Sequence, residues 1–139
     1  MAFKYFNPNP DISLFKSGKP KNWTKNDSCI RAICKATNNT WENIFTELYQ
    51  LAIKKYDMID SKNIINEYCE KNNFTYVTYG KPKQNEKRPT VFDFANKYKI
   101  GTYILYLRNY YVCVKDGVIY NVCDVKNESI YSYWKYNDM

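Results

Sequence analysis

The strongest constraint on the fold is a change in the hydrophobic pattern near Gly101. Before this residue, apolar side chains recur at intervals of three and four, which is the period of an amphipathic helix. After it, runs of β-branched and aromatic residues predict strands. A chain with helices first and strands afterwards favours an α+β domain. We therefore expect N-terminal helices packed on a C-terminal antiparallel β-sheet.

Four helices are predicted in the first part of the chain. Asp27 or Ser28 is the expected N-cap of the first, and Thr90 with Asp93 forms a capping box for the last. The predicted spans are 27–37, 40–55, 60–71 and 90–98. The second of these is predicted to be a core helix, because its apolar residues keep the helical period: Trp41, Ile44, Phe45, Leu48, Leu51 and Ala52.

Five strands are predicted, at 74–79, 102–107, 110–115, 118–122 and 129–134. Asp116-Gly117 separates two of these runs and is typical of a type I′ hairpin turn. At 139 residues the chain has the size of one domain, which we place at 26–139. Residues 1–25 predict an extended, basic N-terminal arm that packs on this domain. Five residues would pin the arm: Phe3, Tyr5, Phe6, Leu14 and Phe15.

The charge and the cysteines limit the class of protein. The chain has 21 Lys+Arg and 14 Asp+Glu, a net charge of +7 that would attract phosphates, acidic proteins or anionic lipid, or would only solvate the surface. It shows neither a signal-peptide core nor a run of about 20 apolar residues. We expect an intracellular protein with reduced thiols and no membrane partner. We expect no metal or cofactor, because the cysteines match no zinc spacing: Cys29, Cys34, Cys69, Cys113 and Cys123.

Cys29 lies at the start of the first predicted helix. The positive end of the helix dipole and the unpaired N–H groups there favour a thiolate, so Cys29 is a candidate nucleophile. It is equally a small apolar residue that could fill the core, as we expect for the other four cysteines. The chain contains no histidine, which removes the usual general base of thiol hydrolases.

Several segments together carry a family resemblance. Cys29 is followed by Ile-Arg-Ala-Ile-x-Lys-Ala-Thr, and the next helix begins Trp-Glu-x-Ile. The later segments read Gly-Thr-Tyr-Ile-Leu and Val-x-Val-Lys-Asp-Gly-Val-Ile-Tyr. Over about residues 6–134 the chain resembles small papain-like cysteine-peptidase-fold proteins of bacteriophages and bacterial genomes. The resemblance implies a papain-like fold.

The resemblance also implies a site. Cys29 falls on the family's nucleophile, and Asn26 falls near the side chain that lines the oxyanion hole. Tyr110 occupies the position of the catalytic histidine. Asn121 falls on the residue that orients the imidazole, with Asp124 as the second candidate. A phenol with a pKa of about 10 is a poor base near neutral pH, whereas histidine has a pKa of about 6.5. We therefore predict that the site has lost efficient catalysis.

Three functions from different classes follow. The first is a catalytically inactive pseudo-peptidase, phage-encoded, that binds a host or viral protein. An anti-CRISPR-type inhibitor of a host defence system is its most concrete form, acting in the host cytoplasm or as part of the virion. The second is an atypical thiol hydrolase or transferase that uses Cys29 and takes its base from the substrate or a partner.

The third function is nucleic-acid binding or a virion role based on the positive charge. Lysines interleaved with aromatic side chains favour single-stranded nucleic acid. The aromatic candidates are Trp23, Tyr79 and Trp134. The basic loop that forms the candidate binding surface carries Lys81, Lys83, Lys87 and Arg88.

Overall fold

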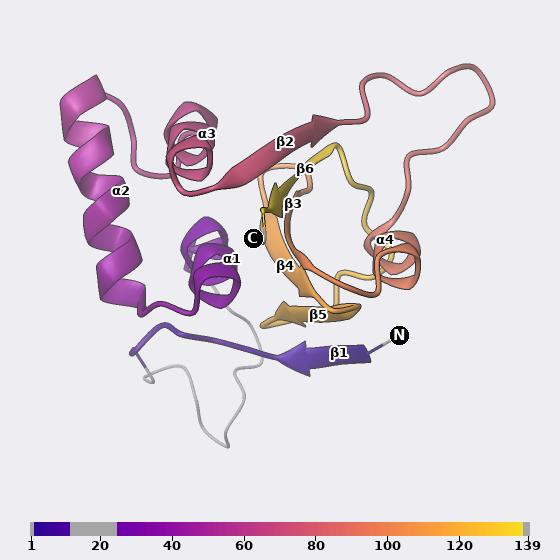
Figure 1. Ribbon diagram of the computed structural model, residues 1–139, viewed down its shortest axis with the longest axis horizontal. Coiled ribbons are helices and arrows are strands. Elements are labelled where there is room, and N and C mark those ends of the chain that lie inside the picture. Colours follow the sequence, from indigo (N-terminus) through magenta and orange to yellow (C-terminus); the bar gives the residue numbers. More distant parts are fainter. Residues whose placement is uncertain (1, 12–24, 138–139) are drawn as a thin grey trace.

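The computed structural model describes residues 2–11 and 25–137, and over these residues it has four helices and one six-stranded mixed sheet (Figure 1). The predicted α+β class is confirmed. The helices are α1 (Ser28–Thr37), α2 (Trp41–Lys55), α3 (Lys62–Lys71) and α4 (Val91–Lys97). The strands are β1 (Ala2–Tyr5), β2 (Phe74–Thr78), β3 (Thr102–Tyr106), β4 (Tyr111–Lys115), β5 (Val118–Asn121) and β6 (Ser132–Tyr136).

The sheet differs from the prediction in one pairing. Its strand order is β1-β5-β4-β3-β6-β2, and β1 runs parallel to β5 while the other neighbours are antiparallel. The expectation of a purely antiparallel sheet is therefore wrong. Part of the predicted extended arm is this strand, and its partner lies at the far end of the chain, where no local sequence signal could indicate the pairing. Leu14 and Phe15 lie outside the described residues.

Local signals account for most element boundaries. The capping box is confirmed, since the Asp93 backbone N–H donates to Thr90 Oγ1 at 3.1 Å and the Thr90 N–H donates to Asp93 Oδ2 at 3.0 Å. Asp116 and Gly117 have φ angles of 50° and 76°, as the predicted type I′ turn requires. The last strand spans Ser132–Tyr136 rather than 129–134, and it pairs with both β2 and β3. Ser129 instead forms an isolated antiparallel bridge with Thr90.

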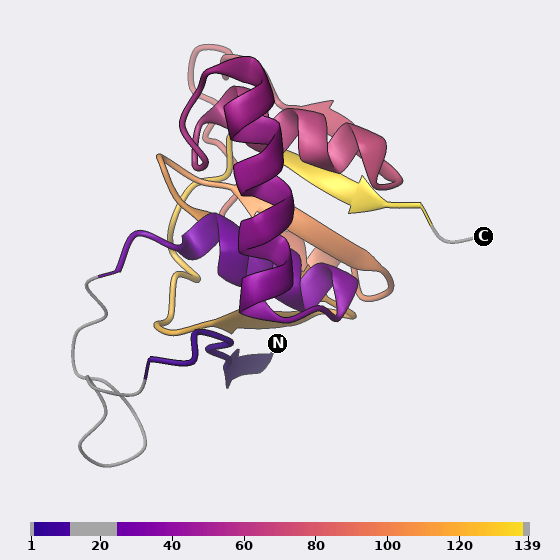
Figure 2. The same ribbon diagram turned by 90° about the vertical axis from the view of Figure 1, so that its left-hand side faces the viewer.

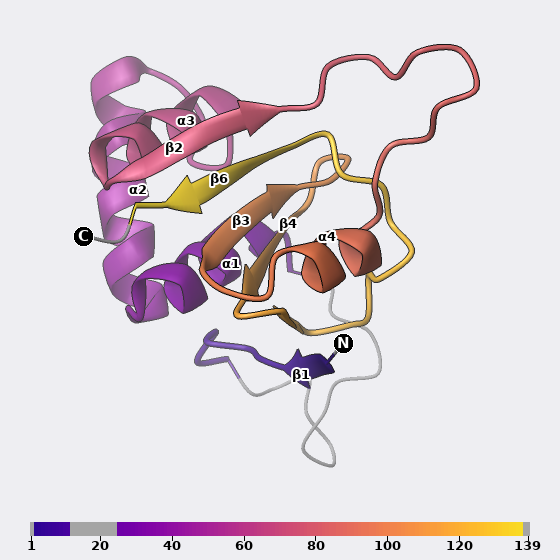
Figure 3. The ribbon, with the colours of Figure 1, turned by 45° about the vertical axis from the view of Figure 1, so that its right-hand side comes forward.

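The core has two parts, one on each face of the sheet. Alternate residues of one strand point to opposite faces. On β3, Ile104 packs with the helices α1 to α3, whereas Tyr103 and Leu105 pack with α4. Figure 2 shows α2 in front of α1 and the sheet, and Figure 3 shows α4 on the side of the sheet opposite α2. The central strands are therefore buried on both faces.

Helix α1 lies between the sheet and α2, and its closest strand is β4 (Figure 1). This arrangement places the start of α1 beside the start of β4. The outer face of α2 is more apolar than a solvent face usually is: Phe45, predicted to lie in the core, is exposed and stacks on Trp41 at 5.2 Å between ring centroids. Among the described residues, no helix is long and apolar enough to cross a membrane.

Candidate functional site

Cys29 lies in the first turn of α1 and is only 4% exposed. It lines a cavity of about 380 Å³ together with Asn26, Tyr110, Asp60 and Lys62. A smaller cavity of about 290 Å³ is also lined by Cys29 and extends to the aromatic side chains at the start of α2. The structure thus brings Cys29, Asn26 and Tyr110 to one cavity. Asn26 itself is exposed.

The start of α1 is fixed by contacts other than the predicted cap. Asp27 occupies the N-cap position, but its side chain makes no capping hydrogen bond to the helix. The expected capping role of its carboxylate is therefore wrong. Ser28 Oγ instead accepts a hydrogen bond of 3.1 Å from the backbone N–H of Tyr111. This bond ties the first turn of α1 to the first residue of β4.

The carboxylate of Asp27 faces Arg31, which is only 3% exposed. The two side chains form an ion pair one helical turn apart. The guanidinium Nη2 also donates to the Tyr110 hydroxyl at 2.7 Å and to Asn121 Oδ1 at 3.3 Å. The Tyr110 hydroxyl in turn donates to Asn121 Oδ1 at 3.0 Å. Arg31 thereby bridges the two side chains that the resemblance aligns with the catalytic base and its orienting residue.

We call Asp27, Arg31, Tyr110 and Asn121 the buried polar cluster. Asn9 Nδ2 and Trp41 Nε1 donate to Asp27 Oδ2 at 2.9 and 3.0 Å. At the other end, the Asn121 amide donates to the backbone carbonyl of Cys123 at 3.0 Å. The cluster therefore links the N-terminal segment, α1, α2, the residue that precedes β4 and the strand β5.

Sequence reasoning missed the roles of Asp27 and Arg31 in this cluster. A signal was nevertheless present, because the two residues are four apart and Arg31 lies between the apolar residues Ile30 and Ala32 of α1. An opposite-charge pair at that spacing stabilises a helix, and a buried charge needs such a partner.

The electrostatic environment of Cys29 is the opposite of the predicted one. Burial, and to a smaller extent the nearby Asp60 carboxylate, raise the pKa of its thiol to about 12. Hydrogen bonds from the backbone N–H groups of Ile30 and Cys29 itself lower the pKa, but they are outweighed. The expectation that the helix terminus produces a thiolate is therefore wrong, and Cys29 is a neutral thiol near pH 7.

Tyr110 is also neutral near pH 7. Burial raises the pKa of its phenol, although the Arg31 guanidinium and the Asn121 hydrogen bond act in the opposite direction. A guanidinium carries only donors and does not lose its proton in proteins. Neither Tyr110 nor Arg31 is therefore a base that can take a proton from Cys29 near pH 7.

The remaining candidate residues lie apart from this cavity. Asp124 is exposed and accepts a hydrogen bond of 3.0 Å from the Lys126 N–H. Cys123 is exposed, which corrects the expectation that it fills the core. The other three cysteines are buried as predicted: Cys34, Cys69 and Cys113.

The basic loop joins β2 to α4 and projects from the molecule (Figure 1). Lys81, Lys83 and Lys87 are exposed. Arg88 closes the base of the loop, since its Nη1 donates to the Gly80 carbonyl at 2.8 Å and its guanidinium lies 4.2 Å from the centre of the Tyr131 ring. Among the aromatic side chains expected to stack on bases, Trp134 is buried, Tyr79 is partly exposed and Trp23 lies outside the described residues.

Comparisons of the chain with protein-family models, curated proteins and solved structures find no significant match.

Proposed function

We propose that the protein is a catalytically inactive, papain-like scaffold that acts by binding another protein. The observation that carries this proposal is the position of Arg31. Its buried guanidinium donates to both Tyr110 and Asn121, where a cysteine peptidase would need a base and its orienting residue. A hydrolase would also need a thiolate, and burial keeps Cys29 protonated.

The partner follows from the resemblance to phage and bacterial proteins. A phage-encoded inhibitor that acts in the cytoplasm of the host cell and blocks a host defence complex is the most concrete form of the proposal. A virion-associated protein is the alternative setting for the same binding function. The cavity beside Cys29, which has aromatic and charged walls, supports binding without chemistry.

An active thiol enzyme is the second candidate, because Cys29 does line a cavity of about 380 Å³. Alkylation with iodoacetamide at pH 7, followed by peptide mapping, separates the two candidates. The exposed Cys123 serves as an internal reference within the same molecule. We expect Cys123 to be modified well before Cys29, because alkylation needs an accessible thiolate. Faster modification of Cys29 than of Cys123 would overturn the proposal.

Capture of partners from host cells tests the binding function itself. The tagged protein and its Cys29→Ala variant should retain the same host protein, and neither should cleave it. Loss of that partner from the Cys29→Ala variant alone would show that the thiol takes part in the function. A captured protein that is cleaved by the unmodified chain but not by the variant would establish the enzyme instead.

A further inference from the structure

Strand β2 forms one border of the sheet. It pairs only with β6, and no other described strand lies on its outer side (Figures 1 and 3). Of its five residues only Phe74 is buried. An exposed strand edge offers unpaired N–H and C=O groups to which another extended chain can bind.

The hydrogen bonds at the two ends of β2 show which groups point outward. The Asn137 N–H donates to the Asn73 carbonyl at 2.9 Å, and the Tyr79 N–H donates to the Tyr131 carbonyl at 3.2 Å. In an antiparallel pair such bonds occur at alternate residues. Odd-numbered residues of β2 therefore face β6, and the backbone groups of Phe74, Tyr76 and Thr78 point away from the sheet.

Apolar side chains accompany this edge on both faces. Tyr76 is 39% exposed and lies against Trp134, with 4.8 Å between the ring centroids. Val77 and Tyr79 are 36% and 37% exposed, and the Tyr79 ring lies 5.7 Å from that of Tyr133. An added strand could bury its alternate side chains against these surfaces, as peptides do when they extend a sheet.

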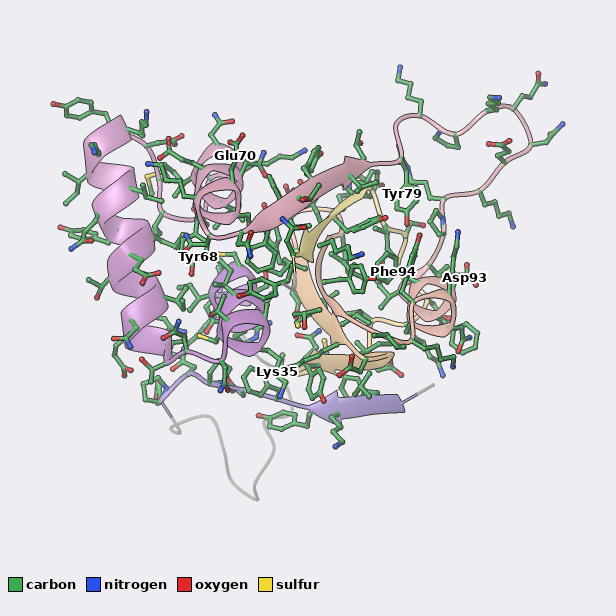
Figure 4. The ribbon with its side chains drawn as sticks, in the orientation of Figure 1. Lys35, Tyr68, Glu70, Tyr79, Asp93 and Phe94 are labelled. Carbon is green, nitrogen blue, oxygen red and sulfur yellow. The ribbon has the colours of Figure 1, made fainter. Side chains whose placement is uncertain are left out.

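Positive charge is concentrated at one end of the edge. The chain passes from β2 through Tyr79 into the basic loop. This loop contains three lysines and Arg88 but only one acidic residue, Glu86, so its net charge is +3. Figure 4 shows nitrogen-tipped side chains projecting outward from this loop, which begins after the labelled Tyr79. No ion pair involves the three lysines among the residues that the structure describes. An incoming chain with acidic side chains at that end would complement this charge.

We propose that the β2 edge binds an acidic, extended segment of another protein as an additional strand. The segment pairs with the backbone groups of Phe74, Tyr76 and Thr78 and places its carboxylates beside Lys81, Lys83 and Lys87. This names the partner class for the binding function proposed above and rests on that function, but it uses a surface separate from the cavity of Cys29. The three lysines could instead only protect the edge from self-pairing, and the experiment distinguishes these roles.

The probes are short fluorescent peptides of alternating valine and threonine with glutamates at the N-terminal or the C-terminal end. Matched peptides carry glutamine in place of glutamate. Fluorescence anisotropy at low salt should show binding of one glutamate peptide, with weaker binding of the glutamine peptide and weaker binding as salt rises. The end that carries the glutamates in the bound peptide reports the direction of the added strand. Absence of binding by both glutamate peptides overturns the proposal, as does equal binding of the glutamine peptides.

Two pairs of variants locate the interaction. Thr78→Pro removes one outward N–H group and leaves the β2–β6 bonds in place, whereas Thr78→Ala keeps that N–H. We expect Thr78→Pro to weaken peptide binding about tenfold relative to Thr78→Ala. Replacing Lys81, Lys83 and Lys87 together with glutamine should weaken peptide binding about tenfold. The control variant replaces Lys54, Lys97 and Lys99 with glutamine and changes the net charge equally. Its affinity for the peptide should stay within about twofold of that of the unmodified chain. Circular dichroism verifies that each variant is folded.

The other outcomes are equally specific. If the unmodified chain binds no peptide and the loop-lysine variant self-associates in analytical ultracentrifugation, the lysines only protect the edge, and the proposal is wrong. A single-stranded oligonucleotide that binds through the loop lysines and is indifferent to Thr78→Pro would identify a nucleic-acid surface instead. If host-partner capture persists while the Thr78 and lysine variants have no effect, this inference fails and the proposed binding function stands.

Discussion

At the scale of single residues, the character of the site depends on Arg31. Its charge is buried and is balanced by Asp27, which also accepts hydrogen bonds from Asn9 and Trp41. Removing one member of a buried ion pair leaves the other charge without compensation, which costs much more than the net contribution of the pair. The cluster should therefore be a structural requirement in this chain.

We expect Arg31→Met to lower the free energy of unfolding by about 3–5 kcal/mol, because the buried Asp27 carboxylate would lose its ion pair with Arg31. Urea denaturation at neutral pH measures this loss. Lys126→Met is the control, since Lys126 pairs with Asp124 at 4.0 Å on the exposed surface, and its loss should cost no more than about 1 kcal/mol.

A double variant tests the physical reason. Asp27→Asn combined with Arg31→Met removes both charges, so its stability should exceed that of Arg31→Met alone. Equal instability of the single and the double variant would show that packing, and not the lost ion pair, accounts for the loss.

At the scale of elements, the C-terminal end of α2 departs from the usual local rule. The C-cap residue of α2 is Tyr56, which adopts the left-handed conformation with φ of 53° and is 97% exposed. Glycine is the usual residue at this position because a Cβ atom disfavours that conformation. Nothing in the described contacts of Tyr56 offsets this cost.

Tyr56→Gly should therefore raise the free energy of unfolding by about 0.5–1 kcal/mol. Thermal and urea denaturation both measure this gain. Tyr49→Gly provides the matched control on the same helix, where glycine should instead lower stability by about 1 kcal/mol. Tyr49 also stacks on Phe45 at 6.1 Å, so its removal costs an additional contact. A loss of stability in Tyr56→Gly would contradict the argument.

At the scale of the whole molecule, the closely packed core keeps its thiols neutral. Burial is the largest cause that raises the pKa values of Cys29, Cys34 and Cys113 to about 12. Burial also raises the phenol pKa of Tyr110. In the unfolded chain the thiols would titrate near 9, the ordinary value for cysteine.

Stability should consequently fall at alkaline pH. Between the unfolded and the folded pKa values the unfolded state binds fewer protons, so the stabilisation is complete below about pH 9 and is lost as pH rises toward about 12. Each buried thiol should contribute a slope of up to about 1.4 kcal/mol per pH unit. Urea denaturation at a series of pH values measures the slope, which Cys113→Val should reduce. A stability that stays constant above about pH 9 would contradict these raised pKa values.

Local structure was largely predictable from the sequence. The periodicity, the Thr90–Asp93 capping box and the Asp116-Gly117 turn determine short-range geometry, and the structure confirms the capping box and the turn. The resemblance placed Tyr110 and Asn121 in related roles, and the structure brings them within hydrogen-bond distance. The papain-like fold and the function of the site are still proposals.

By itself, the sequence determined the helices, the hairpin and the absence of any histidine, because these depend on neighbouring residues or on composition. The tertiary structure decided the parallel pairing of β1 with β5, since its partners are remote in the chain. It also decided the protonation of Cys29. The helix terminus acts locally and favours a thiolate, whereas desolvation depends on every element packed around the thiol, and here desolvation is the larger effect.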